Sequence, residues 1–177
     1  MVEDTRHWEA GKCLEKLKGT LEPSEFGFRI QGLAAHILLR LGARVLQINS
    51  QGHPDIVAET ERGLVRIEVE ADMHGSRARS PTEEDLHAIA PHSLADKGYF
   101  AVALCGPYPR WLLVEHERLR RRHGNPASPA ILQALADTEA SGRWTAEFVE
   151  LLINHCTRLP SFSFDFLARR AKEGRPL

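Results

Sequence analysis

Apolar residues recur at three- and four-residue intervals between Pro23 and Arg40, which predicts a helix with one buried face. Gly42 supplies the stop signal after this helix, and a shorter helix is predicted over residues 7–18, ending at Gly19. The apolar positions of the longer helix are Phe26, Ile30, Leu33, Ala34, Ile37, Leu38 and Leu41.

Three short runs after this helix predict strands: Arg44–Ile48, Asp55–Glu59 and Leu64–Ala71. The last run alternates strictly, so its two faces carry different side chains. Val65, Ile67 and Val69 share one face, and Arg66, Glu68 and Glu70 share the other. The segment 60–63 ends in a glycine and joins the last two runs, which predicts a hairpin.

Downstream, Ser80-Pro81-Thr82-Glu83 is a good helix start, and this helix is predicted to run to about Asp96. Tyr99–Leu104 is a continuous apolar run of strand length, which is typical of a central strand, and Arg110–Glu115 predicts a further strand. Residues 129–171 are mostly helical in pattern, with breaks at Gly142 and Pro160. The elements indicate an α/β or α+β fold with a central mixed sheet flanked by helices. We expect a core over residues 1–128 and a helical C-terminal extension, 129–177, packed on the same domain.

Composition narrows the class of protein. With 177 residues, 42% hydrophobic and 27% charged, the chain resembles an ordinary soluble domain. No apolar stretch is long enough to span a bilayer, and the N-terminus has no apolar signal region. Three cysteines, an odd number at scattered positions, suit a reducing cytosol and give no zinc spacing. We therefore expect a cytoplasmic protein with no membrane partner.

The hairpin brings acidic residues together. Folding it about Glu61 and Arg62 places Asp55 opposite Glu68, and Glu70 lies two residues along the same face. Such a cluster repels itself unless a cation neutralises it, and oxygen ligands suit Mg²⁺ or Mn²⁺. The alternative is that Glu68 and Glu70 form the solvated face of an amphipathic strand.

Pro54-Asp55 and Glu68-Val69-Glu70, preceded by the helix segment Glu25–Val45, resemble the PD-(D/E)xK nuclease superfamily. The resemblance covers residues 24–106 and implies a restriction-endonuclease-like αβββαβ core that hydrolyses phosphodiester bonds in DNA with Mg²⁺ or Mn²⁺. It implies metal ligation by Asp55, Glu68 and the Val69 carbonyl. Glu70 would ligate a metal or orient the attacking water. Most members carry lysine at the position of Glu70, although a minority of restriction enzymes carry glutamate there and are active.

Further residues are candidates for accessory roles. Glu25 or Gln31 would close the site, and His53 would contact the scissile phosphate or simply occupy a turn. Lys97 would supply a displaced ammonium group or lie at a solvated helix end. Contacts to DNA are expected from the loop after the acidic strand and from the basic run RLRRRHG, for which a solvated helix end is the alternative. These DNA-contact candidates are His74, Arg77, Arg79, Arg120, Arg121 and Arg122.

The first functional hypothesis is a divalent-metal-dependent DNA endonuclease acting in restriction, repair or phage defence. The second is a catalytically inactive nuclease-fold subunit that binds DNA or supports an assembly, and the third is a soluble domain unrelated to nucleases. Cleavage of both strands of a duplex normally takes two active sites, so we expect a homodimer. No HExxH, Walker A, GxSxG or GxGxxG motif is present, so the chemistries of those motifs have no support.

Overall fold

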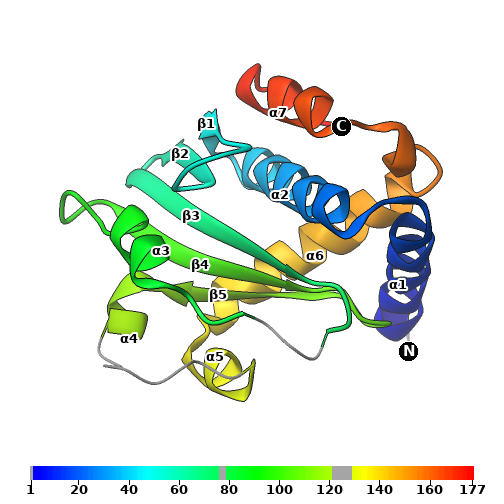
Figure 1. The fold of residues 1–177 in the computed structure, drawn as a ribbon, viewed down its shortest axis with the longest axis horizontal. Helices are drawn as coiled ribbons and strands as arrows, with labels where there is room; N and C mark the ends of the chain where they lie inside the picture. The colour runs from blue at the N-terminus through cyan, green and yellow to red at the C-terminus, as the bar shows by residue number, and fades with distance from the viewer. Residues whose placement is uncertain (1, 76–78, 121–128) are drawn as a thin grey trace.

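The computed structural model describes residues 2–75, 79–120 and 129–177 (Figure 1). Its elements follow in the order α1 (Val2–Thr20), α2 (Pro23–Arg40), β1 (Arg44–Ile48), β2 (Ile56–Thr60), β3 (Gly63–Asp72), α3 (Glu83–Ala88), β4 (Lys97–Leu104), β5 (Arg110–Glu115), α4 (His116–Arg120), α5 (Pro129–Leu135), α6 (Thr138–His155), the 3₁₀ turn η1 (Leu159–Ser161) and α7 (Phe164–Lys172).

The strands form one mixed five-stranded sheet in the order β1-β2-β3-β4-β5. β1, β2 and β3 are antiparallel neighbours, β4 lies parallel to β3, and β5 returns antiparallel to β4. The connection between the parallel strands β3 and β4 carries α3, as a parallel pair requires a crossover. β3 is therefore the central strand of the sheet: β2 pairs with it from Gly63 to Ile67, and β4 pairs with it from Val65 to Asp72.

Helices cover both faces of this sheet, and the two faces differ in the size of their cores. Figure 1 shows α2 and α6 on one side of the strands and α3 on the other. The larger core gathers α1, α2, α6 and α7 against residues such as Ile67 and Trp111. The smaller core lies under α3, α4 and α5 and centres on Phe100 and Val102. Glu68 pairs with Phe100 across the β3–β4 ladder and so lies on the face with the smaller core.

Most predicted elements are confirmed, but several boundaries differ from the prediction. The first helix runs from Val2 to Thr20 rather than over residues 7–18, and β4 begins at Lys97 rather than at Tyr99. The helix over 23–40 and the strands Arg44–Ile48 and Arg110–Glu115 occur as predicted. The helix predicted to reach Asp96 ends at Ala88, because Pro91 disfavours helical backbone at the residue before it. Gly142 does not break α6, since Trp144 and Phe148 are buried in the larger core and this burial outweighs the roughly 1 kcal/mol that an interior glycine costs.

Cys13 of α1 and Cys156, the residue that follows α6, form a disulfide across a sequence separation of 143, whereas Cys105 is free and buried. The scattered spacing gave no sign of this pairing, and the pairing removes the support that the cysteine pattern lent to a reducing compartment. Within the described ranges, none of the helices combines the length and the apolar character needed to cross a membrane.

Candidate metal centre

The β2–β3 hairpin has the register predicted for it. Ile56 pairs with Ile67 and Thr60 with Gly63, so Asp55, one residue before β2, faces the position of Glu68. The carboxylate of Asp55 is fixed there because its Oδ2 accepts a hydrogen bond of 2.8 Å from the Val69 amide. The register thus brings together the two carboxylates expected to act as ligands. Val69 was expected to act through its carbonyl, but the group that contacts Asp55 is its N–H.

Glu68 is a buried carboxylate with only half of its hydrogen-bonding capacity used. The residue is 3% exposed. Its Oε1 lies 2.7 Å from His53 Nδ1, whereas its Oε2 is buried and has no hydrogen-bond partner in the part of the chain that the structure describes. The alternative of a solvated strand face is therefore wrong for Glu68. A buried carboxylate oxygen without a partner is unusual, because desolvation of such an atom is costly unless a donor or cation compensates.

The loop between β1 and β2 holds His53 in place. The Asn49 amide donates to the Asp55 carbonyl at 2.8 Å, and Asn49 Nδ2 donates to the Pro54 carbonyl at 2.7 Å. Gln31 of α2 is buried, and its Nε2 donates to the Asn49 carbonyl and, at 3.5 Å, to that of Asp55. Gln31 therefore positions the loop through backbone atoms.

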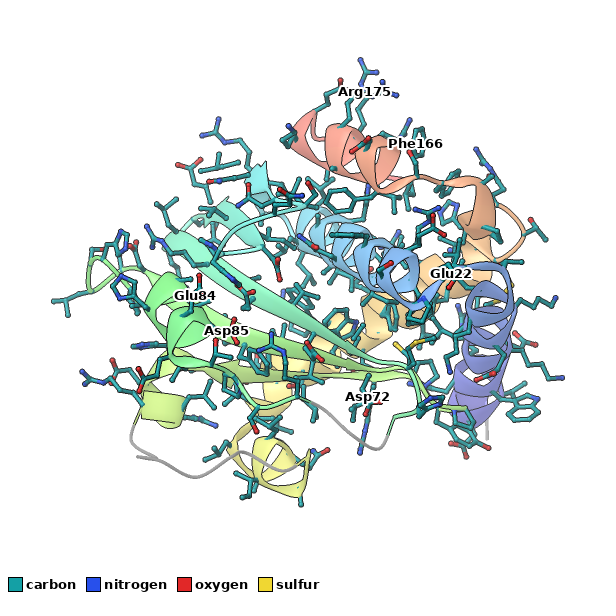
Figure 2. All side chains as sticks on the ribbon, in the orientation of Figure 1. Glu22, Asp72, Glu84, Asp85, Phe166 and Arg175 are labelled. Atoms are coloured by element: carbon teal, nitrogen blue, oxygen red, sulfur yellow. A yellow bond between two sulfur atoms is a disulfide. The ribbon has the colours of Figure 1, made fainter. Side chains whose placement is uncertain are left out.

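Helix α3 brings a further carboxylate that the sequence did not single out. Asp85 is 2% exposed and closes a capping box with Thr82, whose backbone N–H donates to Asp85 Oδ2 at 2.7 Å. The other oxygen, Oδ1, lies 3.7 Å from His53 Nδ1. Glu84, the residue before it, is exposed and lies 3.8 Å from His53 Nε2. Figure 2 shows Glu84 and Asp85 side by side on α3, over the strands. His53, Glu68 and Asp85 each offer one atom that could bind a metal ion, and these three atoms all lie within 4.8 Å of one another.

Burial and mutual repulsion dominate the electrostatics of this cluster. Burial, reinforced by the charge of Glu68, raises the pKa of Asp55 from 3.8 to about 7. Burial also raises the pKa of Glu68, and the hydrogen bond from His53 opposes that rise. Desolvation lowers the pKa of His53, but the hydrogen bond to Glu68 and the charges of Glu68, Glu84 and Asp85 together outweigh it, so the pKa of His53 is raised. Asp85 has a lowered pKa, since donors from Thr82 and Arg79 outweigh its burial.

No family model, curated protein or solved structure matches this chain. The chemistry of the centre therefore rests on its own residues. The two buried carboxylates of Glu68 and Asp85 and the imidazole of His53 form a donor set that fits a divalent cation. Glu68 Oε2, which has no hydrogen-bond partner among the described residues, is the observation that favours a cation over a purely structural network.

Glu70 and Arg79 lie at the edge of this cluster. Glu70 is partly buried, and its Oε2 accepts from Arg79 Nε at 3.1 Å. Arg79 also donates through Nη1 to Asp85 Oδ2 at 2.5 Å, and its guanidinium lies 5.7 Å from the centre of the Phe100 ring. With 41% of its side chain exposed, Arg79 presents a fixed positive charge to solvent beside the carboxylates. The positive charge that Glu70 contacts is therefore the guanidinium of Arg79 in the same chain.

The remaining candidates lie away from the cluster. Lys97 begins β4 three positions before Phe100, so strand alternation turns it to the opposite face, and its Nζ donates to Glu115 at 2.9 Å. The displaced-ammonium role is therefore wrong for Lys97, and so is the helix end, because Lys97 belongs to a strand. Glu25 is exposed in the first turn of α2, where it interacts with Arg29.

The expected DNA contacts are only partly described. His74 is exposed in the turn after β3, where its backbone N–H donates to Asp72 Oδ1 at 3.0 Å. Arg120 is exposed on α4 and pairs with Glu117 at 3.3 Å. Arg77, Arg121 and Arg122 lie outside the described residues.

Proposed function

We propose that this protein is a divalent-metal-dependent endonuclease that hydrolyses phosphodiester bonds in DNA. The observation that carries the proposal is the buried Glu68 carboxylate, whose Oε2 lacks a partner among the described residues while Asp55 repels it from the opposing strand. Burying such a pair is destabilising unless a cation binds there. Glu68 lies on β3, the central strand of the sheet.

The order of the elements supports the nuclease class. A helix, three antiparallel strands, a short helix and a parallel strand follow one another in α2, β1, β2, β3, α3 and β4. This is the αβββαβ order that the resemblance to PD-(D/E)xK nucleases implies. The two acidic motifs fall on the hairpin of that order, Asp55 directly before β2 and Glu68 on β3.

In the proposed reaction, Asp55 and Glu68 would hold the cation, and the hydrogen bond from the Val69 amide keeps the Asp55 carboxylate in place. When bound there, a divalent ion supplies positive charge that lowers the pKa of water and stabilises the negative charge developing on the phosphate. Arg79 contacts a phosphate oxygen of the substrate from the rim, oriented by its ion pair with Glu70. Cleavage of a duplex then requires two chains, which makes a homodimer part of the proposal.

The test is a plasmid-nicking assay with purified protein. We expect supercoiled DNA to be nicked or linearised with Mn²⁺ or Mg²⁺ and to stay intact with EDTA. Glu68→Gln should remove cleavage, because it removes the anionic ligand and keeps its shape. Glu61→Gln, in the exposed turn of the same hairpin, is the matched control and should cleave like wild type. Cleavage that survives Glu68→Gln would refute the proposed site.

The second candidate function is a nuclease-fold subunit that binds DNA without cutting it. It is favoured by Glu70, which stands where most PD-(D/E)xK members carry lysine and forms an ion pair with Arg79. The two functions differ in one result. A wild-type protein that binds DNA at low salt but cuts none with any divalent ion supports the subunit.

A further inference from the structure

We infer that the cation held by this centre is a first-row transition-metal ion such as Mn²⁺ or Zn²⁺, bound through the imidazole of His53 together with Glu68 and Asp85, rather than Mg²⁺ in an all-oxygen site. The inference rests on the proposed function for the presence of a metal, and it goes beyond that function in adding His53 and Asp85 to the ligands Asp55 and Glu68 and in naming the class of ion.

The geometry of the three donors is that of ligands to one ion. Ligands about 2.1 Å from a common metal lie roughly 3–3.5 Å from one another. His53 Nδ1 lies 2.7 Å from Glu68 Oε1 and 3.7 Å from Asp85 Oδ1, which brackets that spacing. Each donor comes from a different segment: the β1–β2 loop, the central strand β3 and the first turn of α3.

A second observation points independently to a cation. Glu68 is almost fully buried, yet its Oε2 has no donor among the residues that the structure describes. The contact between His53 and Oε1 satisfies only one oxygen of that carboxylate. A cation beside both oxygens would compensate the charge that the protein leaves uncompensated.

The surroundings of His53 suit a metal-bound imidazole. Its Nδ1 faces the two buried carboxylates, so the opposite nitrogen, Nε2, is turned to the exposed carboxylate of Glu84 at 3.8 Å. Histidines that bind metals through one nitrogen commonly direct the other toward a carboxylate, which fixes the tautomer and the ring orientation. The loop hydrogen bonds of Asn49 hold the chain next to His53 before any ion arrives.

The donor set decides the class of ion. Mg²⁺ prefers six oxygen ligands with near-octahedral geometry and retains several waters. An imidazole nitrogen favours ions later in the first transition row, and affinity for a mixed nitrogen and oxygen site rises from Mn²⁺ toward Zn²⁺.

The experiment is calorimetric titration of metal-free protein with MnCl₂, ZnCl₂ and MgCl₂, in the absence of DNA. We expect one Mn²⁺ or Zn²⁺ per chain, bound at least tenfold more tightly than Mg²⁺. His53→Gln should weaken Mn²⁺ and Zn²⁺ binding at least tenfold and change Mg²⁺ binding less than threefold. His87→Gln, an exposed histidine on α3, is the matched control and should bind like wild type.

Pulsed electron paramagnetic resonance of the Mn²⁺-loaded protein provides a second measurement. The coupling of a nitrogen nucleus to Mn²⁺ should be present in wild type and absent in His53→Gln, whose folding is verified by its thermal melt. Mg²⁺ binding as tight as Mn²⁺ binding, or an equal effect of His53→Gln on both ions, would overturn the inference. Tight Mn²⁺ binding without DNA cleavage refutes only the nuclease function, whereas cleavage with Mg²⁺ and no nitrogen coupling refutes only this inference.

Discussion

Asp55→Asn should stabilise the metal-free protein, although it removes a proposed ligand. The asparagine side chain keeps an oxygen that can accept from the Val69 amide, so the hydrogen bond of Asp55 Oδ2 can be retained. What the substitution removes is the charge of a half-buried carboxylate that faces Glu68. The variant should therefore lose metal-dependent cleavage and gain folding stability.

The magnitude follows from the pKa of Asp55, which rises from 3.8 to about 7 on folding. Because each pKa unit corresponds to about 1.4 kcal/mol, the wild type loses up to about 4 kcal/mol of stability between the two values. The sign is fixed by the direction of the shift. Below pH 4 both states are protonated and nothing is lost, and the loss grows as the pH rises to 7. We expect Asp55→Asn to be more stable than wild type by about 3 kcal/mol at pH 8, or about 10 °C in Tm for a chain of this length.

Urea denaturation in EDTA at pH 5 and pH 8 measures this difference. Asp96→Asn is the control, because Asp96 accepts from the Leu64 amide and pairs with Arg66, and its pKa is lowered by these partners despite the opposing desolvation. That variant should be less stable than wild type at neutral pH. An Asp55→Asn protein that is folded but no more stable than wild type at pH 8 would refute the description of the site as an uncompensated acidic cluster.

Three further predictions concern other parts of the chain. Glu70→Lys should abolish plasmid nicking and leave DNA binding at low salt, since it removes the carboxylate that orients Arg79; a variant that nicks at the wild-type rate would contradict this role. His36→Gln should flatten the acid limb of a stability–pH curve, because burial lowers the pKa of His36 to about 4 and wild type therefore loses up to about 3 kcal/mol as the pH falls from 6.5 to 4; an unchanged slope would oppose it. Cys13→Ser should cost oxidised protein up to about 5 kcal/mol, because the bond to Cys156 closes a long loop; a reductant should lower the Tm of wild type only, and an equal effect on the variant would contradict the prediction.

The hairpin half of the site could be predicted from the sequence because its geometry is local. Alternation along 64–71 and the glycine at the end of the turn fix which residues face one another, and this sufficed to place Asp55 opposite Glu68. The element boundaries around the hairpin were predictable for the same reason. Local pattern decides strands and turns of this length.

The α3 half could not be predicted, because its position depends on packing across the sheet. Asp85 comes near His53 only because α3 docks against β3, and no local pattern encodes that contact. The spacing of Thr82 and Asp85 in a capping box was the available signal, yet a capping residue ordinarily has no further role. The misplacement of Lys97 has a related origin, because the predicted helix extended to about Asp96 and concealed the start of β4.

One carboxylate, that of Asp85, belongs both to the first turn of a helix and to the centre. Its Oδ2 accepts from Thr82 and Arg79 and so caps α3, and its Oδ1 faces His53. A ligand that binds Oδ1 must therefore also stabilise the folded first turn of α3. By thermodynamic reciprocity, folding of α3 must strengthen the binding of that ligand. A six-residue helix is too short to be stable in isolation, so α3 depends on its contacts with the rest of the protein. Ligand binding at the centre should thus increase the protection of the α3 amides from hydrogen exchange, and loss of the ligand should decrease it. Binding would then be detectable at backbone amides several residues from the ligand.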